Sequence, residues 1–176
     1  LELNDSMAII QYLIYQYPGP LTPENNEVAA RVGMYWGWVQ DYYSFVLSPF
    51  HDIITGHNEV FWRNLRLTDS LANGGKKAGV ENLATLHKKR VEYLERHLVK
   101  VNAGPFLTGS KCSYADVFLY TCVRTVQESQ GFGLLRDACE GKPFAEFNLV
   151  TNISAAVGEI SDVKQIVGTK FVDYPI

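Results

Sequence analysis

The fold of this chain is decided by one stretch, Gly104–Tyr120, which reads GPFLTGSKCSYADVFLY. Ser113 can accept a hydrogen bond from the backbone N–H of Asp116, and the Asp116 carboxylate can accept one from the N–H of Ser113 or Tyr114. Gly-Pro precedes this cap and apolar residues follow it, so the pattern predicts a buried helix from Ser113 to about Gln130. A carboxylate that accepts two backbone N–H groups is a structural acceptor, which argues against Asp116 as a general base.

Composition limits the class of protein. A length of 176 residues is typical of one domain, and a net charge of −3 argues against a nucleic-acid surface. No apolar run approaches the roughly 18 residues that a membrane span requires. The three cysteines form no C-x-x-C pair, which fits a reducing compartment. The four histidines have no carboxylate or thiol partner at ligand spacing, so no metal site is expected. We expect a soluble, cytoplasmic protein without nucleic-acid or membrane partners.

Apolar periodicity predicts helices along most of the chain. A helix from Ser6 ends before Pro18-Gly19-Pro20, and a long helix from about 24 to 47 ends at Pro49. The stripe expected to face the core in this long helix is Val28, Val32, Tyr35, Trp36, Val39, Tyr43 and Val46. Residues 50–79 lack periodicity and are interpreted as an insertion with irregular or short helical structure. Further helices are expected over 80–102, 113–130, 142–157 and 160–167, which together predict an all-α bundle.

A second stretch, Leu1–Leu13, reads LELNDSMAIIQYL. It is similar to the strand and "[EQ]-S-x-A-I-x-x-Y-L" helix of cytosolic glutathione transferases, and Gly104–Tyr120 resembles their "F-L-x-G-x-x-x-[ST]-x-A-D" segment. The resemblance implies a helical bundle of the glutathione S-transferase C-terminal type, preceded by a strand–helix remnant of a thioredoxin-like domain. Residues 1–18 would be the end of that truncated glutathione-binding domain, 19–23 the linker, and 24–176 the helical domain.

The resemblance also implies a function. The complete protein would conjugate the glutathione thiolate to small hydrophobic electrophiles and would form a homodimer, with glutathione as cosubstrate and no cofactor. The family's catalytic Tyr, Ser or Cys would lie upstream of Leu1, so no catalytic residue is expected in this chain, which alone would be nearly inactive.

Asp5 and Ser6 are the candidate glutathione-binding residues. A helix N-terminus presents unpaired N–H groups and a partial positive charge, so a ligand carboxylate can bind the Ser6 N–H and hydroxyl. The resemblance implies that Asp5 takes the ammonium of the γ-glutamyl group, although the family carries the longer Glu or Gln there. The alternative is that Ser6 only caps its helix and Asp5 only interacts with the helix dipole.

The resemblance implies an electrophile pocket walled by three segments of the helical domain. The matching positions are Met34, Gly37, Trp38, Asp41 and Phe45 on the first long helix, Phe118 and Cys122 on the capped helix, and Phe171 and Tyr174 in the tail. An aromatic stripe can equally be core, and Cys122 can equally be an inert buried thiol. Gly37 costs stability inside a helix, which the close approach of a ligand or a neighbouring helix would explain.

Two other readings stay open. Glutathione transferase-like helical domains also serve as non-catalytic interaction modules in translation factor and synthetase assemblies. An unrelated helical bundle is the other alternative.

Overall fold

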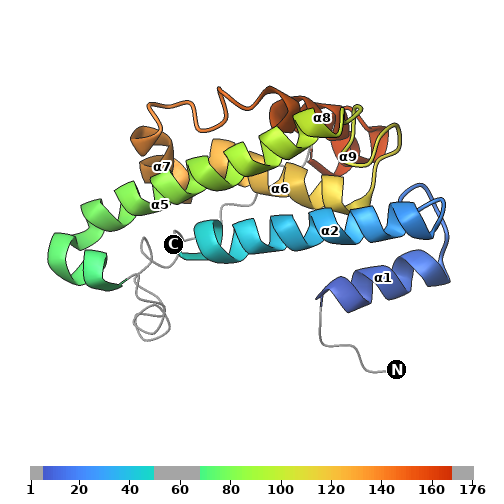
Figure 1. Ribbon diagram of the computed structural model, residues 1–176, viewed down its shortest axis with the longest axis horizontal. Coiled ribbons are helices and arrows are strands. Elements are labelled where there is room, and N and C mark those ends of the chain that lie inside the picture. Colours follow the sequence, from blue (N-terminus) through green and yellow to red (C-terminus); the bar gives the residue numbers. More distant parts are fainter. Residues whose placement is uncertain (1–5, 50–67, 168–176) are drawn as a thin grey trace.

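A computed structural model describes residues 6–49 and 68–167 (Figure 1). Within these ranges the chain is all-α, as predicted. Strand-like pairing in the described part is limited to one isolated bridge between Phe106 and Gly109. The predicted strand over 1–3 and the tail after 167 lie outside the described residues. The elements are α1 (Ser6–Gln16), α2 (Asn26–Tyr42), η1 (Tyr43–Leu47), α5 (Thr68–Lys100), α6 (Tyr114–Glu128), η2 (Gln130–Phe132), α7 (Gly133–Ala138), α8 (Asn148–Gly158) and α9 (Ser161–Val167).

Helix α2 begins at an Asn cap and ends in a π-helical turn. The Asn25 side chain accepts a hydrogen bond of 2.9 Å from the Val28 N–H. At the other end the Ser48 N–H donates to the carbonyl of Tyr43, five residues earlier, so η1 is wound more widely than an α-helix. The predicted stripe faces the core, with Val28 half-buried, except at Tyr43, which is 46% exposed, whereas its neighbour Tyr42 is 1% exposed. Tyr42 is inside because its hydroxyl has a buried hydrogen-bond partner, His87.

Helix α5 is longer than predicted. It starts at Thr68, so the expectation of irregular structure over 50–79 is wrong for residues 68–79, and residues 50–67 are not described. Helix propagation adds one backbone hydrogen bond per residue, which offsets the cost of the glycines in this segment. The helix ends in a Schellman motif, in which the N–H groups of Asn102 and Ala103 donate to Val99 O and Leu98 O. Asn102 has φ 49°, a left-handed conformation that Asn tolerates.

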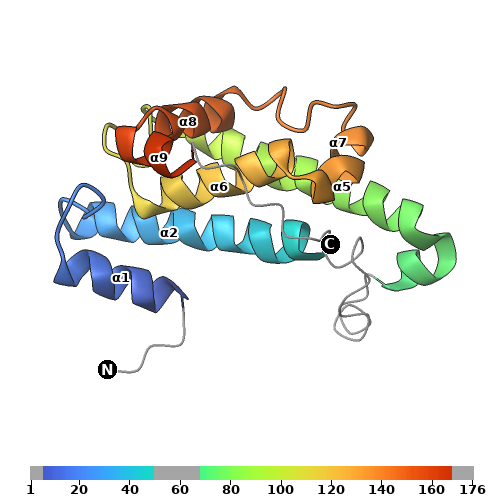
Figure 2. The same ribbon diagram turned by 180° about the vertical axis from the view of Figure 1, so that it is seen from behind.

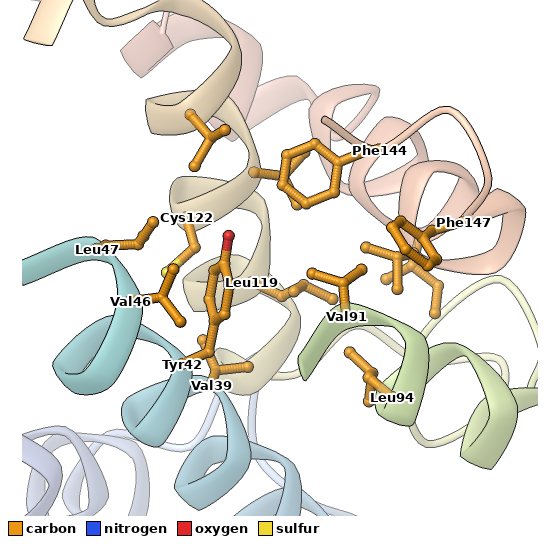
Figure 3. Packing of buried hydrophobic residues seen from close by; sticks show 14 of the residues in the cluster. Val39, Tyr42, Val46, Leu47, Val91, Leu94, Leu119, Cys122, Phe144 and Phe147 are labelled. Carbon is orange, nitrogen blue, oxygen red and sulfur yellow. The ribbon is translucent and has the colours of Figure 1, made fainter. Parts of the chain in front are cut away.

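Helix α6 is the centre of the bundle, as its capped, apolar start predicts. It packs against α2 on one side and α8 on another (Figure 1). Figure 3 shows how Tyr42 from α2, Val91 from α5 and Leu119 from α6 meet in one apolar cluster. The predicted helical domain therefore has a continuous core.

The C-terminal part differs from the prediction in two places. The helix expected over 142–157 begins only at Asn148, and α7 was not predicted. Pro143 disfavours helix at the preceding residue, and Phe144 and Phe147 are buried from a non-helical connection. Helix α8 therefore starts without a side-chain cap of its own, and the Glu95 carboxylate of α5 accepts hydrogen bonds from the N–H groups of Leu149 and Val150 at 2.8 and 3.0 Å.

Helix α1 lies along α2 on the side away from α5, as both views show (Figures 1 and 2). Its inward residues Met7, Ile10 and Ile14 pack against the core, and the Met7 methyl lies 4.0 Å from where a Cβ on Gly33 would be. Its outward residues Ile9, Tyr12 and Leu13 are 38–47% exposed. The predicted break after this helix is confirmed, because α1 ends at Gln16 and α2 starts at Asn26.

Candidate functional site

The proposed glutathione-binding end of α1 is described only in part. The described part of α1 starts at Ser6, and Asp5 lies outside the described residues. The N-terminus of a helix carries a partial positive charge, so this end can attract an anion such as a carboxylate. The assignment of Asp5 and Ser6 to glutathione binding stays a prediction.

Most of the predicted pocket residues on α2 and η1 share one open face. Met34 and Phe45 are 52% and 41% exposed, and Gly37 and Asp41 are exposed as well. A Cβ added to Gly37 would have nothing within 4 Å, so no neighbouring helix among the described residues explains this glycine. Phe45 is covered on one side by Arg90 of α5, whose guanidinium carbon lies 5.6 Å from the ring centroid.

Trp38 occupies the edge of this face. Its ring stacks on Tyr42 with the two planes 6° apart, and its Nε1 is buried without a hydrogen-bond partner in the described part of the chain. An unpartnered N–H of this kind is rare and costs free energy, so it is a natural place for an acceptor from a ligand or from residues outside the described ranges.

The predicted residues of α6 are not brought together with this open face. The Phe118 ring packs 4.7 Å from that of Trp36 and 6.1 Å from that of Tyr43, on the side of α2 that faces α6. Cys122 is 2% exposed, and burial raises the pKa of its thiol to about 12, which makes it an inert core residue. Phe171 and Tyr174 lie outside the described residues. The electrophile pocket thus stays a prediction, and its α2 and α6 walls face different directions in the described structure.

The cap at the start of α6 is formed as predicted, and its carboxylate accepts one more hydrogen bond than the sequence predicts. The capping box of Ser113 and Asp116 is present. One oxygen of the buried Asp116 carboxylate accepts the Ser113 N–H at 2.8 Å and its hydroxyl at 2.5 Å. The other oxygen accepts the Leu107 N–H at 2.7 Å, a contact that the sequence reading missed. Burial raises the pKa of Asp116, and these donors oppose the rise. All of this supports a structural role.

Two glycines let this loop close on itself. A Cβ on Gly104 would lie 2.7 Å from the carbonyl oxygen of Gly109, closer than real Cβ contacts come. Gly109 has φ 124°, a conformation that favours glycine. The backbone groups of Phe106 and Gly109 then pair with each other at 3.0 and 3.1 Å.

A second buried polar junction was not predicted. His87 of α5 is fully buried, with Nδ1 2.8 Å from the Tyr42 hydroxyl and Nε2 2.8 Å from the carbonyl oxygen of Pro143. A carbonyl oxygen can only accept, so Nε2 carries the proton and Nδ1 accepts from the Tyr42 O–H. Burial lowers the pKa of His87 and keeps the ring neutral. The partners lie 45 and 56 residues away in sequence, so no local signal could have found this junction.

A surface cleft of about 1260 Å³ adjoins this junction, between α5 and the connection from α7 to α8. Its lining includes the apolar residues Val80, Ala84 and Phe147 and charged residues of both signs. The Lys88–Glu146 ion pair of 2.8 Å crosses it.

Two further classes of site find no support. The described residues contain no group of three or more His, Cys, Asp or Glu side chains placed to hold a metal ion. No helix in the described ranges is long and apolar enough to cross a membrane.

Comparison with known protein families gives a match. The family model for the glutathione S-transferase C-terminal domain matches residues 72–165. This range spans most of α5, all of α6 to α8, and part of α9. Searches of curated proteins and of solved structures each gave no match.

Proposed function

The chain belongs to the glutathione S-transferase C-terminal domain family, and from this premise we propose that the complete protein conjugates the thiolate of glutathione to small hydrophobic electrophiles. In such a reaction the glutathione thiol loses its proton, the sulfur forms a bond to an electrophilic carbon, and the leaving group departs with the bonding electrons. The helical domain would shape the electrophile site.

One observation carries most weight in favour of glutathione. The helix that begins at Ser6 packs against the core of the helical bundle through Met7, Ile10 and Ile14. The Ser6 N–H and hydroxyl would hold a glutathione carboxylate, and Asp5 would take the ammonium group. The electrophile would then lie over the open face of α2, where Met34 and Phe45 offer apolar contact and Gly37 leaves room.

Conjugation of glutathione to a chromogenic electrophile tests this proposal. The assay should use complete protein of verified intact mass, with wild type beside Phe45→Ala and Tyr93→Ala. Tyr93 is the matched control, because it is an aromatic residue on α5 and is 59% exposed. We expect turnover that saturates in both substrates, and a higher KM for the electrophile in Phe45→Ala alone. Turnover unaffected by either variant would remove Phe45 from the site, and absence of turnover would contradict the enzyme.

The alternative is a non-catalytic interaction module. The outward side chains Ile9, Tyr12 and Leu13 of α1 favour a protein contact of some kind, because exposed apolar residues grouped on one helix suit an interface. A protein without turnover and without glutathione binding would support this alternative. Sedimentation of the complete protein would test the homodimer that we also propose.

A further inference from the structure

We propose that Lys111 is a positioning residue for glutathione binding, because it holds the linker at Thr22 and thereby fixes α1 on the helical domain. The inference rests on the proposed function, since it concerns the helix that carries the proposed glutathione-binding end. Lys111 itself touches neither substrate.

The contact joins two segments that are far apart in sequence. The Lys111 ammonium donates a hydrogen bond of 3.0 Å to the carbonyl oxygen of Thr22, 89 residues earlier, in a partly buried setting. Within the described ranges Lys111 forms no ion pair, so its charge is directed at this carbonyl. A charge-assisted hydrogen bond to a neutral acceptor is stronger than an ordinary one, which suits a contact that must hold a linker in place.

The Thr22 side chain connects the linker to α1 through hydrogen bonds. Its hydroxyl accepts the Gly19 N–H at 2.8 Å and lies 3.4 Å from the carbonyl oxygen of Ile14, to which it donates. Ile14 is in the last turn of α1, where backbone carbonyls lack partners within the helix and no basic side chain is present. Thr22 therefore closes the linker turn with its hydroxyl, gives the Ile14 carbonyl at the end of α1 a donor, and accepts the Lys111 hydrogen bond with its own carbonyl.

The loop that carries Lys111 is held in one conformation by hydrogen bonds and close backbone packing. It is the loop that Asp116 closes through the Leu107 and Ser113 N–H groups, and that the close approach of Gly104 to Gly109 keeps compact. The linker and this loop face each other across a crevice of only about 50 Å³, which Thr22, Pro23, Lys111 and Cys112 help to line. Figure 2 shows both segments at the same end of the molecule.

Loss of Lys111 would loosen the far end of α1. The helix has 11 residues and is therefore about 16 Å long, so a small rotation near Thr22 displaces the Ser6 end more than the Ile14 end. Packing of Met7, Ile10 and Ile14 against the core would keep α1 attached. The expected defect is thus misplacement rather than unfolding.

The test compares Lys111→Met, Lys111→Arg and Lys89→Met in the complete protein. Arg keeps the donor, and Lys89 is the matched control because it is exposed and no described partner holds it. We expect Lys111→Met to raise the KM for glutathione about fivefold while kcat and the KM for the electrophile change less than about twofold. Lys111→Arg should restore the wild-type KM, and Lys89→Met should not change it. Equal effects on both substrates, or no effect, would overturn the proposal.

Hydrogen exchange separates this inference from the proposed function. Amides of α1 should exchange faster in Lys111→Met than in wild type or Lys111→Arg, without any need for glutathione. If the wild type neither binds nor turns over glutathione, the proposed function fails and Lys111 has no role in glutathione binding. Faster exchange in α1 would then still support the restraint on this helix, whereas unchanged exchange would refute that too.

Discussion

The hydrogen-bonded clusters around Asp116 and His87, here called the Asp116 and His87 junctions, differ in how far apart their partners lie in the sequence. Both bury a titratable side chain completely, and both give each of its polar atoms a partner. Asp116 gathers donors from within nine residues and closes one loop, whereas His87 joins α2, α5 and the connection before α8. The difference teaches that a local junction fixes the shape of one segment, while a long-range junction fixes how segments are arranged.

Burial moves the two pKa values in opposite directions, toward the neutral form in each case. The pKa of Asp116 is raised, so the unfolded state binds fewer protons than the native state above its usual value, and the free energy of unfolding falls as pH rises through that window. The pKa of His87 is lowered, so the unfolded state binds more protons below about pH 6.5 and stability is lost as pH falls.

Asp116→Asn should produce the largest effect. The amide group of Asn would place an N–H₂ against one of the backbone donors and leave it unsatisfied in the core. We expect the free energy of unfolding to fall by about 2–4 kcal/mol. Urea denaturation followed by circular dichroism measures it, with Asp137→Asn as the exposed control. A loss as small as the control's would mean that the loop does not depend on this carboxylate.

Tyr42→Phe should have a smaller effect at the other junction. It removes the donor to His87 Nδ1 while it keeps the ring that stacks on Trp38. We expect a loss of about 1–3 kcal/mol, because a buried acceptor is left without a partner. Tyr43→Phe is the control, since Tyr43 is 46% exposed. Equal unfolding midpoints for the two variants would show that the Tyr42–His87 hydrogen bond does not stabilise the fold.

The pH dependence of stability distinguishes the junctions most clearly. Between about pH 6.5 and the lowered pKa of His87, the wild type should lose at most about 1.4 kcal/mol per pH unit from this group. His87→Gln should remove that slope, and His97→Gln on the same helix should keep it. An NMR titration in which the His87 ring protonates at its ordinary pKa would contradict this explanation.

Gly37→Ala tests the open side of the helix that carries Tyr42, and the effect should be smallest and of opposite sign. A Cβ there would meet nothing within 4 Å, so the substitution should stabilise α2 by up to about 1 kcal/mol. Thermal denaturation measures this gain, and Gly158→Ala is a contrasting control, because its Cβ would lie 3.3 Å from the Tyr120 ring. A higher KM for the electrophile in Gly37→Ala would place the ligand against this face, whereas a loss of stability would refute the open face itself.

The parts of the structure that were predicted are those whose cause is local. The Ser113–Asp116 cap and most of the α2 stripe depend on residues a few positions apart, where capping and periodicity act. The burial of Tyr42 rather than Tyr43, the late start of α8 and the capping of α8 by Glu95 depend on partners far away in sequence. No periodicity of one segment carries that information.

The candidate site follows the same division. The sequence correctly placed Met34, Gly37, Asp41 and Phe45 on one helix face, because helical spacing decides it. It could not show that Phe118 packs toward Trp36 on the other side of α2, or that Cys122 is sealed in the core, because both depend on how α6 packs.

Glutathione titration by calorimetry is the most direct test of the central proposal, that the N-terminal end of α1 binds glutathione. The complete protein should be compared with Ser6→Ala and with Ser161→Ala, which removes a serine at the start of α9 instead. We expect wild type and Ser161→Ala to bind glutathione equally and Ser6→Ala to bind about tenfold more weakly, as loss of a hydrogen bond to a charged group predicts. Equal affinity in all three proteins, or no binding by the wild type, would contradict the proposed role of this helix.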